Sequence, residues 1–215
     1  MSNGLAPVNA RTEDLFDSVA EASGRELTLV SRLDHPTSGV LPMALGPEGS
    51  VAANWLQAQF AARLVLKEYL CLVEGCSVGR VGSTAKINAP LQTIKRRDQL
   101  RTEVSSLGRE AVTEYEVLAR YDAGASTNRT LSLLVARPRT GRTHQIRVHM
   151  ASIGAPIVGD LTYGMKHDSA VPSCGRLFLH CRRIKCKDLK KNDFEAEAAL
   201  PPELLEVLRQ LQKVE

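Results

Sequence analysis

Residues 137–164 have the sequence RPRTGRTHQIRVHMASIGAPIVGDLTYG, which combines a core-facing helical pattern with a high density of polar side chains. A helix is predicted over residues 143–153, because three apolar positions are spaced for one buried face: Ile146, Met150 and Ile153. Two arginines, two histidines and a glutamine lie within residues 141–149. Because backbone N–H groups at a helix start bind anions, the segment indicates a binding site, although a basic surface helix would have a similar composition.

The segments around this stretch predict a domain built mainly on β-strands. Helices are predicted where apolar residues recur at helical spacing, over residues 11–23, 48–63 and 203–213. Strands are predicted where apolar residues alternate or run together, over residues 26–33, 40–45, 67–74, 84–87, 101–107, 111–120, 130–136 and 177–184. Two excursions are expected to be loop-like, residues 78–108 and 163–175. The predicted fold class is α+β, a single catalytic domain with a large, mostly antiparallel mixed sheet flanked by helices and loops.

The composition is that of a globular domain rather than of a membrane or secreted protein. The chain has 215 residues, of which 43% are hydrophobic and 24% charged. No stretch approaches the ~20 apolar residues of a membrane span, and the first residues contain no apolar signal core. The five cysteines are an odd number, which argues against a disulfide framework. We therefore expect a cytoplasmic protein without membrane contact, or an organellar one if the N-terminus is incomplete.

Metal binding is not expected from the spacing of the possible ligands. His144 and His149 are five residues apart, so on a helix they point ~140° away from each other and cannot share a metal ion. Two cysteine pairs have a four-residue gap instead of the tighter CxxC spacing that is typical of zinc sites: Cys71 with Cys76, and Cys181 with Cys186. The site is therefore predicted to contain no metal.

Basic residues exceed acidic ones by 28 to 24, a formal charge of +4 that permits an RNA partner without showing one. Many of them gather in three basic islands, which are Lys95, Arg96, Arg97 and Arg101; Arg137, Arg139, Arg142 and Arg147; and Arg182, Arg183, Lys185, Lys187, Lys190 and Lys191. The islands predict a phosphate-binding surface if they lie on one side of the fold. The alternative is that each island is an ordinary solvated face.

A second polar segment has the sequence SRLDHPTSG and follows the predicted strand 26–33. Alternation places Arg32 and Asp34 on the same face at the end of this strand. A carboxylate beside a cation at a strand end can act as a nucleophile or a base. Three small residues follow, which let a ligand approach the backbone closely: Thr37, Ser38 and Gly39. The alternative is a structural ion pair followed by a turn.

Tyr69 is the third candidate and lies in the sequence Lys67-Glu68-Tyr69 of the predicted strand 67–74. Its ring offers a π-face on which any nucleobase can stack. A tyrosine in a strand is also an ordinary core residue. The position therefore indicates a base-binding site only together with the other two polar segments.

These segments together resemble the motifs of RluA-type pseudouridine synthases. RLDHPTSGV is similar to the RLD-x-x-TSG sequence around the catalytic aspartate of that family, and KEYLCLVEG is similar to its K-x-Y strand. Residues 137–164 resemble its TGRTHQIR block, including the GD-x-x-YG sequence at the end. The sequences RLFLH and PPELLEVL follow in the family's order, so the resemblance covers roughly residues 28–210.

The resemblance implies an isomerase that converts uridine into pseudouridine in ribosomal or transfer RNA, without a metal or an organic cofactor. It implies that Asp34 is the catalytic aspartate, that Arg147 is its ion-pair partner and that Tyr69 packs on the flipped uridine. Arg32 is expected to enter the RNA where the base has left. The remaining residues expected to shape the pocket or bind substrate are Thr37, Ser38, Gly39, Arg142, Thr143, His144 and Gln145.

The resemblance also implies a domain organisation. Residues 25–215 are expected to form the catalytic domain, and residues 1–24 a helical extension that is truncated or divergent, with no S4-like RNA-binding module. We expect the protein to act as a monomer. Two alternatives are a catalytically silent RNA-binding relative and a hydrolase that uses Ser38 with a histidine. The second lacks the G-x-S-x-G sequence of a nucleophile elbow.

Overall fold

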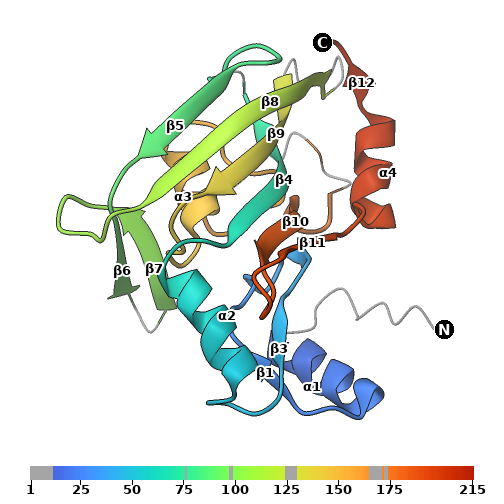
Figure 1. Cartoon of the computed structure of the whole chain (residues 1–215). Coiled ribbons are helices and arrows are strands. Elements are labelled where there is room, and N and C mark those ends of the chain that lie inside the picture. Colours follow the sequence, from blue (N-terminus) through green and yellow to red (C-terminus); the bar gives the residue numbers. More distant parts are fainter. Residues whose placement is uncertain (1–11, 76, 97–98, 124–129, 165–170, 172–173) are drawn as a thin grey trace.

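A large sheet forms the centre of the computed structural model, which describes residues 12–75, 77–96, 99–123, 130–164, 171 and 174–215. Its strands are β2 (Ser38–Gly39), β4 (Leu66–Glu74), β5 (Thr84–Asn88), β8 (Val112–Asp122), β9 (Thr130–Pro138), β10 (Leu179–Lys187), β11 (Asp193–Glu197) and β12 (Gln212–Lys213). Their order is β11-β10-β4-β9-β8-β12, with β2 beside β10 and β5 beside β8. All these pairings are antiparallel except that of β2 with β10 (Figure 1), so the predicted mixed sheet is confirmed.

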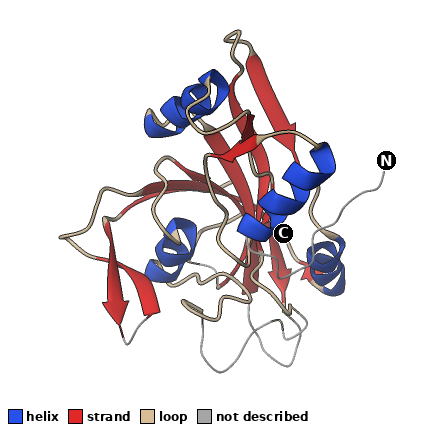
Figure 2. Cartoon of the chain, turned by 90° about the horizontal axis from the view of Figure 1, so that it is seen from below, coloured by secondary structure: helices blue, strands red, loops and turns tan. Residues whose placement is uncertain are grey.

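Two small sheets and four helices complete the described part of the chain. The small sheets are two antiparallel pairs, β1 (Leu27–Leu29) with β3 (Met43–Leu45) and the hairpin of β6 (Leu91–Arg96) with β7 (Gln99–Val104). The helices are α1 (Thr12–Ser23), α2 (Val51–Ala61), α3 (Gln145–Ser152) and α4 (Pro202–Gln210). Figure 2 shows the helices distributed around the sheet instead of stacked in one layer. None of these helices is long and apolar enough to cross a membrane.

The main core forms where α3 and α4 pack with the large sheet. Met150 of α3 and Leu204 of α4 are both buried in one cluster with strand residues such as Leu72 and Leu134. The last four residues of β4 are buried, whereas its first five are only partly buried or exposed. The first half of β4 is therefore the part of the sheet that can line a cavity.

The strand predicted over residues 26–33 is shorter than expected. β1 ends at Leu29, and residues 30–37 form no strand. Asp34 consequently lies on a loop, so the expectation of strand alternation for Arg32 and Asp34 is wrong. β1 pairs only with the three residues of β3, which offers no further ladder to extend it.

Two of the longer strands were not expected, β6 and β11. The β6–β7 hairpin occupies part of the segment expected to be loop-like, and β11 forms the edge of the large sheet. β11 alternates polar and apolar residues, but three of its five residues are acidic and it is mostly exposed, and acidic residues and alanine are depleted in strands. It pairs with β10 through a short turn, in which the Asp188 side chain accepts from the backbone N–H groups of Lys190 and Asn192.

Candidate active site

A cavity of about 260 Å³ opens beside the first half of β4 and collects residues from all three polar segments of the sequence. The expected site residues that line it are Arg32, Asp34, Thr37, Tyr69, Arg142, Thr143, His144 and Gln145. Lys67 lines it as well, because it lies two residues from Tyr69 on the same face of the strand. We call this cavity the Asp34 pocket.

Asp34 enters the pocket from a loop that is held by a turn of its own and by Arg176. The backbone N–H of Thr37 donates to the Asp34 carbonyl at 2.7 Å, which closes a turn. Arg176 donates to the carbonyl oxygen of Pro36 at 2.9 Å. The Asp34 side chain keeps 23% of its surface exposed, and its carboxylate lies 3.9 Å from Nη1 of Arg147. The ion pair implied by the resemblance is therefore present, but it is long.

The closer partner of Arg147 is Asp160, which the sequence analysis did not single out. Two guanidinium nitrogens of Arg147 donate to the two Asp160 oxygens, each at 2.8 Å. The backbone N–H groups of Thr162 and Tyr163 also donate to Asp160, at 2.9 and 3.0 Å. Burial alone would raise the pKa of the fully buried Asp160 carboxyl, but Arg147 and these N–H groups lower it. The signal for Asp160 was its place in the GD-x-x-YG sequence.

Tyr163 connects this ion pair to the β6–β7 hairpin. Its hydroxyl accepts a hydrogen bond from the backbone N–H of Thr102 at 3.1 Å and lies 2.9 Å from Nδ1 of His144. Its ring centre lies 5.1 Å from the Arg147 guanidinium and 5.6 Å from that of Arg101, within cation–π range. Tyr163 therefore couples the hairpin to two residues of the site.

The backbone and the protonation state of His144 follow from its surroundings. His144 has a left-handed backbone (φ 53°), which delays the start of α3 until Gln145. Burial lowers the pKa of the imidazole, and the positive charge of Arg147 acts in the same direction against the opposing effect of Asp34. The Tyr163 O–H can donate to Nδ1 while its oxygen accepts from Thr102. We expect this direction, which would leave the proton of the neutral ring on Nε2.

Tyr163→Phe is expected to lower the turnover rate about tenfold and to leave the fold intact, since the hydrogen bonds it removes are worth ~0.5–1.5 kcal/mol each. The ring, and with it the contact to Arg147, stays. Steady-state kinetics and ¹⁵N NMR of His144 are the measurements, with Tyr121→Phe on β8 as a hydroxyl deletion elsewhere in the sheet. An unchanged turnover rate, or an Nδ1-protonated His144 in the native protein, would contradict the arrangement.

Tyr69 lies on β4 between Cys181 of β10 and Ala136 of β9. Burial raises the pKa of the Tyr69 hydroxyl, and a hydrogen bond with the Cys181 side chain and the nearby negative charge of Asp34 raise it further. The group is therefore a neutral phenol that is held beside Asp34. This placement suits the stacking role that the resemblance implies, which stays a prediction.

A family model described as RNA pseudouridylate synthase matches residues 4–152, more than half of the chain. The chain belongs to the RNA pseudouridylate synthase family. It is 36% identical over 184 residues to tRNA pseudouridine synthase C of Haemophilus ducreyi, covering 81% of this chain and 73% of that protein. It is also 36% identical over 194 residues to ribosomal large subunit pseudouridine synthase C of Vibrio parahaemolyticus, covering 88% of this chain and 56% of that protein. The resemblance to RluA-type enzymes is thereby confirmed.

A solved structure shows the same fold in a more distant protein. Human RNA pseudouridylate synthase domain containing 1 superimposes with a TM-score of 0.76 at 24% identity, covering 97% of this chain and 82% of that one. The match confirms the α+β fold of the pseudouridylate synthase domain. The boundary expected after residue 24 stays a prediction.

Two residues expected to bind substrate in this pseudouridylate synthase lie outside the Asp34 pocket. Ser38 is hydrogen-bonded to Nδ1 of His180 at 2.9 Å, and Nε2 of the same histidine bonds the Ala198 carbonyl at 3.0 Å. A side chain on Gly39 would place its Cβ 2.1 Å from the carbonyl oxygen of Cys181. Ser38 and Gly39 therefore fix the Asp34 loop against β10, and direct substrate contact is not supported.

The same contacts argue against a serine hydrolase. A general base must reach both the nucleophile and the substrate, but His180 is 2% exposed and both its ring nitrogens are occupied. Burial also lowers the pKa of His180, so the ring is neutral in a structural contact. Ser38 and His180 consequently act as a structural pair.

Gln145 lines the pocket as expected, but its amide is fully used inside the protein. Its oxygen accepts from the Thr140 hydroxyl at 2.6 Å and from the Arg142 backbone N–H at 3.0 Å. Its nitrogen donates to the Val112 carbonyl at 2.9 Å and to the Thr113 hydroxyl at 3.0 Å. Gln145 shapes the pocket wall but has no group left for a substrate. The hydroxyl of Thr37, in contrast, is buried without a partner among the described residues.

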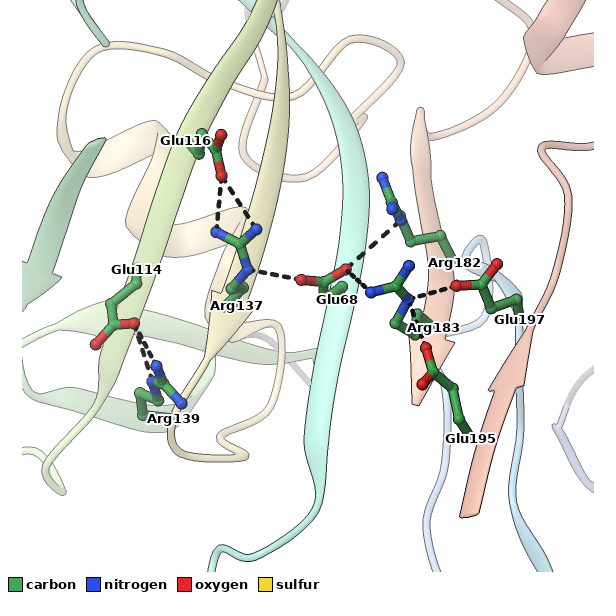
Figure 3. Close-up of polar contacts among 9 residues, drawn as sticks. All are labelled: Glu68, Glu114, Glu116, Arg137, Arg139, Arg182, Arg183, Glu195 and Glu197. Carbon is green, nitrogen blue, oxygen red and sulfur yellow. Dashed lines mark hydrogen bonds and ion pairs between the residues drawn. The ribbon is translucent and has the colours of Figure 1, made fainter. Parts of the chain in front are cut away.

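Most of the second and third basic islands are paired with acidic residues across the sheet (Figure 3). Going from β8 to β11, the main pairs are Glu114–Arg139, Glu116–Arg137, Arg137–Glu68, Glu68–Arg183 and Arg183–Glu197. We call this row the glutamate–arginine ladder. Burial alone would raise the pKa of Glu68, but the charges of Arg137, Arg182 and Arg183 lower it. The ladder therefore has little excess charge with which to bind phosphate.

The first basic island is only partly described by the structure. Arg97 and the side chain of Arg96 lie outside the described residues.

Among the residues described, no group of three or more His, Cys, Asp or Glu side chains could hold a metal ion. The described pocket residues offer carboxylate, guanidinium, imidazole and phenol groups for chemistry.

Proposed function

We propose that this pseudouridylate synthase isomerises specific uridines in transfer or ribosomal RNA to pseudouridine, with Asp34 as its catalytic residue. The observation that supports this most directly is the placement of a partly exposed carboxylate at the pocket wall, 3.9 Å from the Arg147 guanidinium. Asp160 and the ring of Tyr163 hold that guanidinium in place. The carboxylate is thus the reactive group of a preorganised site.

The reaction is an isomerisation and needs no oxidant or external group. The N1–C1′ bond of uridine breaks, and the uracil leaves with the bonding electron pair. C5 of the same uracil then bonds to C1′ and loses its proton, while N1 gains one. Asp34 can take part by attacking C1′ or by removing the proton from C2′, and both routes require the carboxylate to face the sugar.

Substrate must enter the pocket as a flipped nucleotide, because the sugar and base of a stacked nucleotide are covered by their neighbours. Flipping costs a few kcal/mol, least for a base in a loop or bulge. We propose that the Tyr69 ring packs on the flipped base and that Arg32, which is exposed at the pocket edge, enters the vacated position. Thr37 and His144 also line the pocket and would help to hold the uridine.

The test is a map of pseudouridine in cellular transfer and ribosomal RNA from matched cells with and without this protein. Discrete pseudouridines should be lost without the protein and regained when it is supplied again. Purified protein should also form them in unmodified transcripts of the same RNAs. If no position changes although the protein binds RNA, the chain is a catalytically silent relative. A cytoplasmic location and a monomeric state stay predictions from the sequence.

A further inference from the structure

Two groups of arginines lie near the Asp34 pocket and differ in how far carboxylates neutralise them. In the glutamate–arginine ladder, each arginine has at least one glutamate of its own; Arg139, for example, donates twice to Glu114, at 2.7 and 3.0 Å. The second group consists of Arg63, Arg109 and Arg142. Within this group, Arg63 forms an ion pair with Glu110 at 3.0 Å. The carboxylate of Glu110 therefore bonds Arg63, and within the described residues the guanidinium groups of Arg109 and Arg142 form no ion pair.

Part of the second group lines a cavity that adjoins the Asp34 pocket. A neighbouring cavity of about 340 Å³ is lined by Arg109 together with Gly141, Arg142 and Thr143. The last three residues also line the Asp34 pocket. Residues 141–143 therefore form a wall that the two cavities share. We call the cavity lined by Arg109 and Arg142 the arginine groove.

Arg142 is held in a fixed position in this groove. Its Nε donates to the backbone carbonyl of Glu110 at 2.9 Å, which orients the guanidinium without neutralising it. Burial lowers the pKa of Arg142, and the positive charges of Arg109 and Arg63 lower it further. Like charges gathered in this way repel one another, and a bound anion relieves the repulsion.

The chemistry of the groove favours a phosphodiester as its ligand. The planar guanidinium group matches the geometry of phosphate oxygens and can donate two parallel hydrogen bonds. The excess of two positive charges, three arginines minus one glutamate, is sufficient for two singly charged phosphates. RNA is the substrate class of the proposed function, and its backbone must continue on either side of a flipped nucleotide.

We propose that the arginine groove binds the RNA backbone phosphates next to the flipped uridine, with Arg142 and Arg109 as the main contacts and Arg63 as a supporting charge. The inference rests on the proposed function. It also assigns different roles to the basic residues of the second island: Arg142 binds phosphate, whereas Arg137 and Arg139 stabilise the sheet.

The test measures the dissociation constant of a fluorescein-labelled, uridine-containing RNA stem-loop as a function of NaCl concentration. Arg109→Gln and Arg142→Gln are each expected to weaken binding about five- to tenfold at low salt. Each should also reduce the slope of log K against log[salt] by ~0.7–1, because one phosphate contact is lost. Arg139→Gln is the matched control, an arginine with its own glutamate in the ladder, and should change binding less than twofold. Circular dichroism confirms that each variant is folded.

The outcomes separate this inference from the proposed function. If the native protein forms pseudouridine but the Arg109 and Arg142 variants keep the native salt slope, the arginine groove is not the phosphate site. A larger effect of Arg139→Gln than of Arg109→Gln would place the RNA over the ladder and also overturn the inference. If the native protein forms no pseudouridine but the two groove variants lose salt-dependent binding, the proposed function fails while the groove stands.

Discussion

Asp34→Asn is expected to reduce pseudouridine formation more than ~10³-fold while RNA affinity and the fold change little. The amide has the shape of the carboxylate but can neither attack C1′ nor accept a proton from C2′. Asp34 is partly exposed, and its carboxylate forms a long ion pair with Arg147, at 3.9 Å. Arg147 keeps its two hydrogen bonds to Asp160 in the variant. Rapid-quench assays on a modified RNA give the rate, and filter binding gives the affinity.

The control for this substitution is Asp193→Asn on the exposed edge strand β11. Asp193 is also a carboxylate with a basic partner, Lys187 at 2.8 Å, but it is 90% exposed and remote from the pocket lining. Its loss should leave the rate unchanged. If Asp34→Asn formed pseudouridine at the native rate, Asp34 would not be the catalytic residue and the proposed mechanism would be wrong.

Asp160→Asn is expected to have the largest effect on stability. It removes the charge that neutralises Arg147 in a position where both side chains are almost completely buried. Breaking a buried ion pair costs ~3–5 kcal/mol, and the lower end applies here because Asp34 remains near the guanidinium. We therefore expect the free energy of unfolding to fall by about 3 kcal/mol and the melting temperature by ~6–12 °C. Denaturant unfolding and calorimetry measure these changes.

The same variant should change how stability depends on pH. The pKa of Asp160 is lower in the folded protein than the ~3.9 of an unfolded chain. A carboxyl with a depressed folded pKa contributes stability that is fully present above ~3.9 and is lost as the pH falls through the folded pKa. The amide of the variant does not titrate, so the difference in stability between native and variant protein should shrink below about pH 4. A constant difference would contradict the ion-pair assignment.

Activity provides a second readout for Asp160. Without its carboxylate, Arg147 is free to turn fully toward Asp34, so the position of the catalytic carboxylate is no longer determined. We expect a lower turnover rate with little change in KM, because Asp160 is buried and does not line the Asp34 pocket. Asp193→Asn should shift the free energy of unfolding by less than ~1 kcal/mol, as is usual for an exposed pair. A native turnover rate in folded Asp160→Asn would show that the ion pair is structural only.

The sequence was sufficient to predict which segments meet at the site, because the three polar motifs together, in order, resemble those of one enzyme family. It was not sufficient to rank partners within the site. Arg147 was expected to pair with Asp34, but its closer partner is Asp160. The buried Asp160 carboxylate also accepts from two backbone N–H groups, which hold it in place beside Arg147. Similarly, Ser38 and Gln145 had the chemistry of substrate-binding residues, and only their hydrogen-bond partners show that they hold the pocket together.

The amino-acid sequence by itself determined the family, the α+β class, most of the helices and the long apolar strands, since these depend on motifs and on periodic burial. The tertiary structure decided which charges are available. Arginines that looked equivalent along the chain differ once the sheet is formed: Arg139 has Glu114 to itself, whereas Arg109 and Arg142 form no ion pair within the described residues. The physical reason is that a charge is neutralised by its neighbours in space, and strand pairing brings those neighbours together from distant parts of the chain.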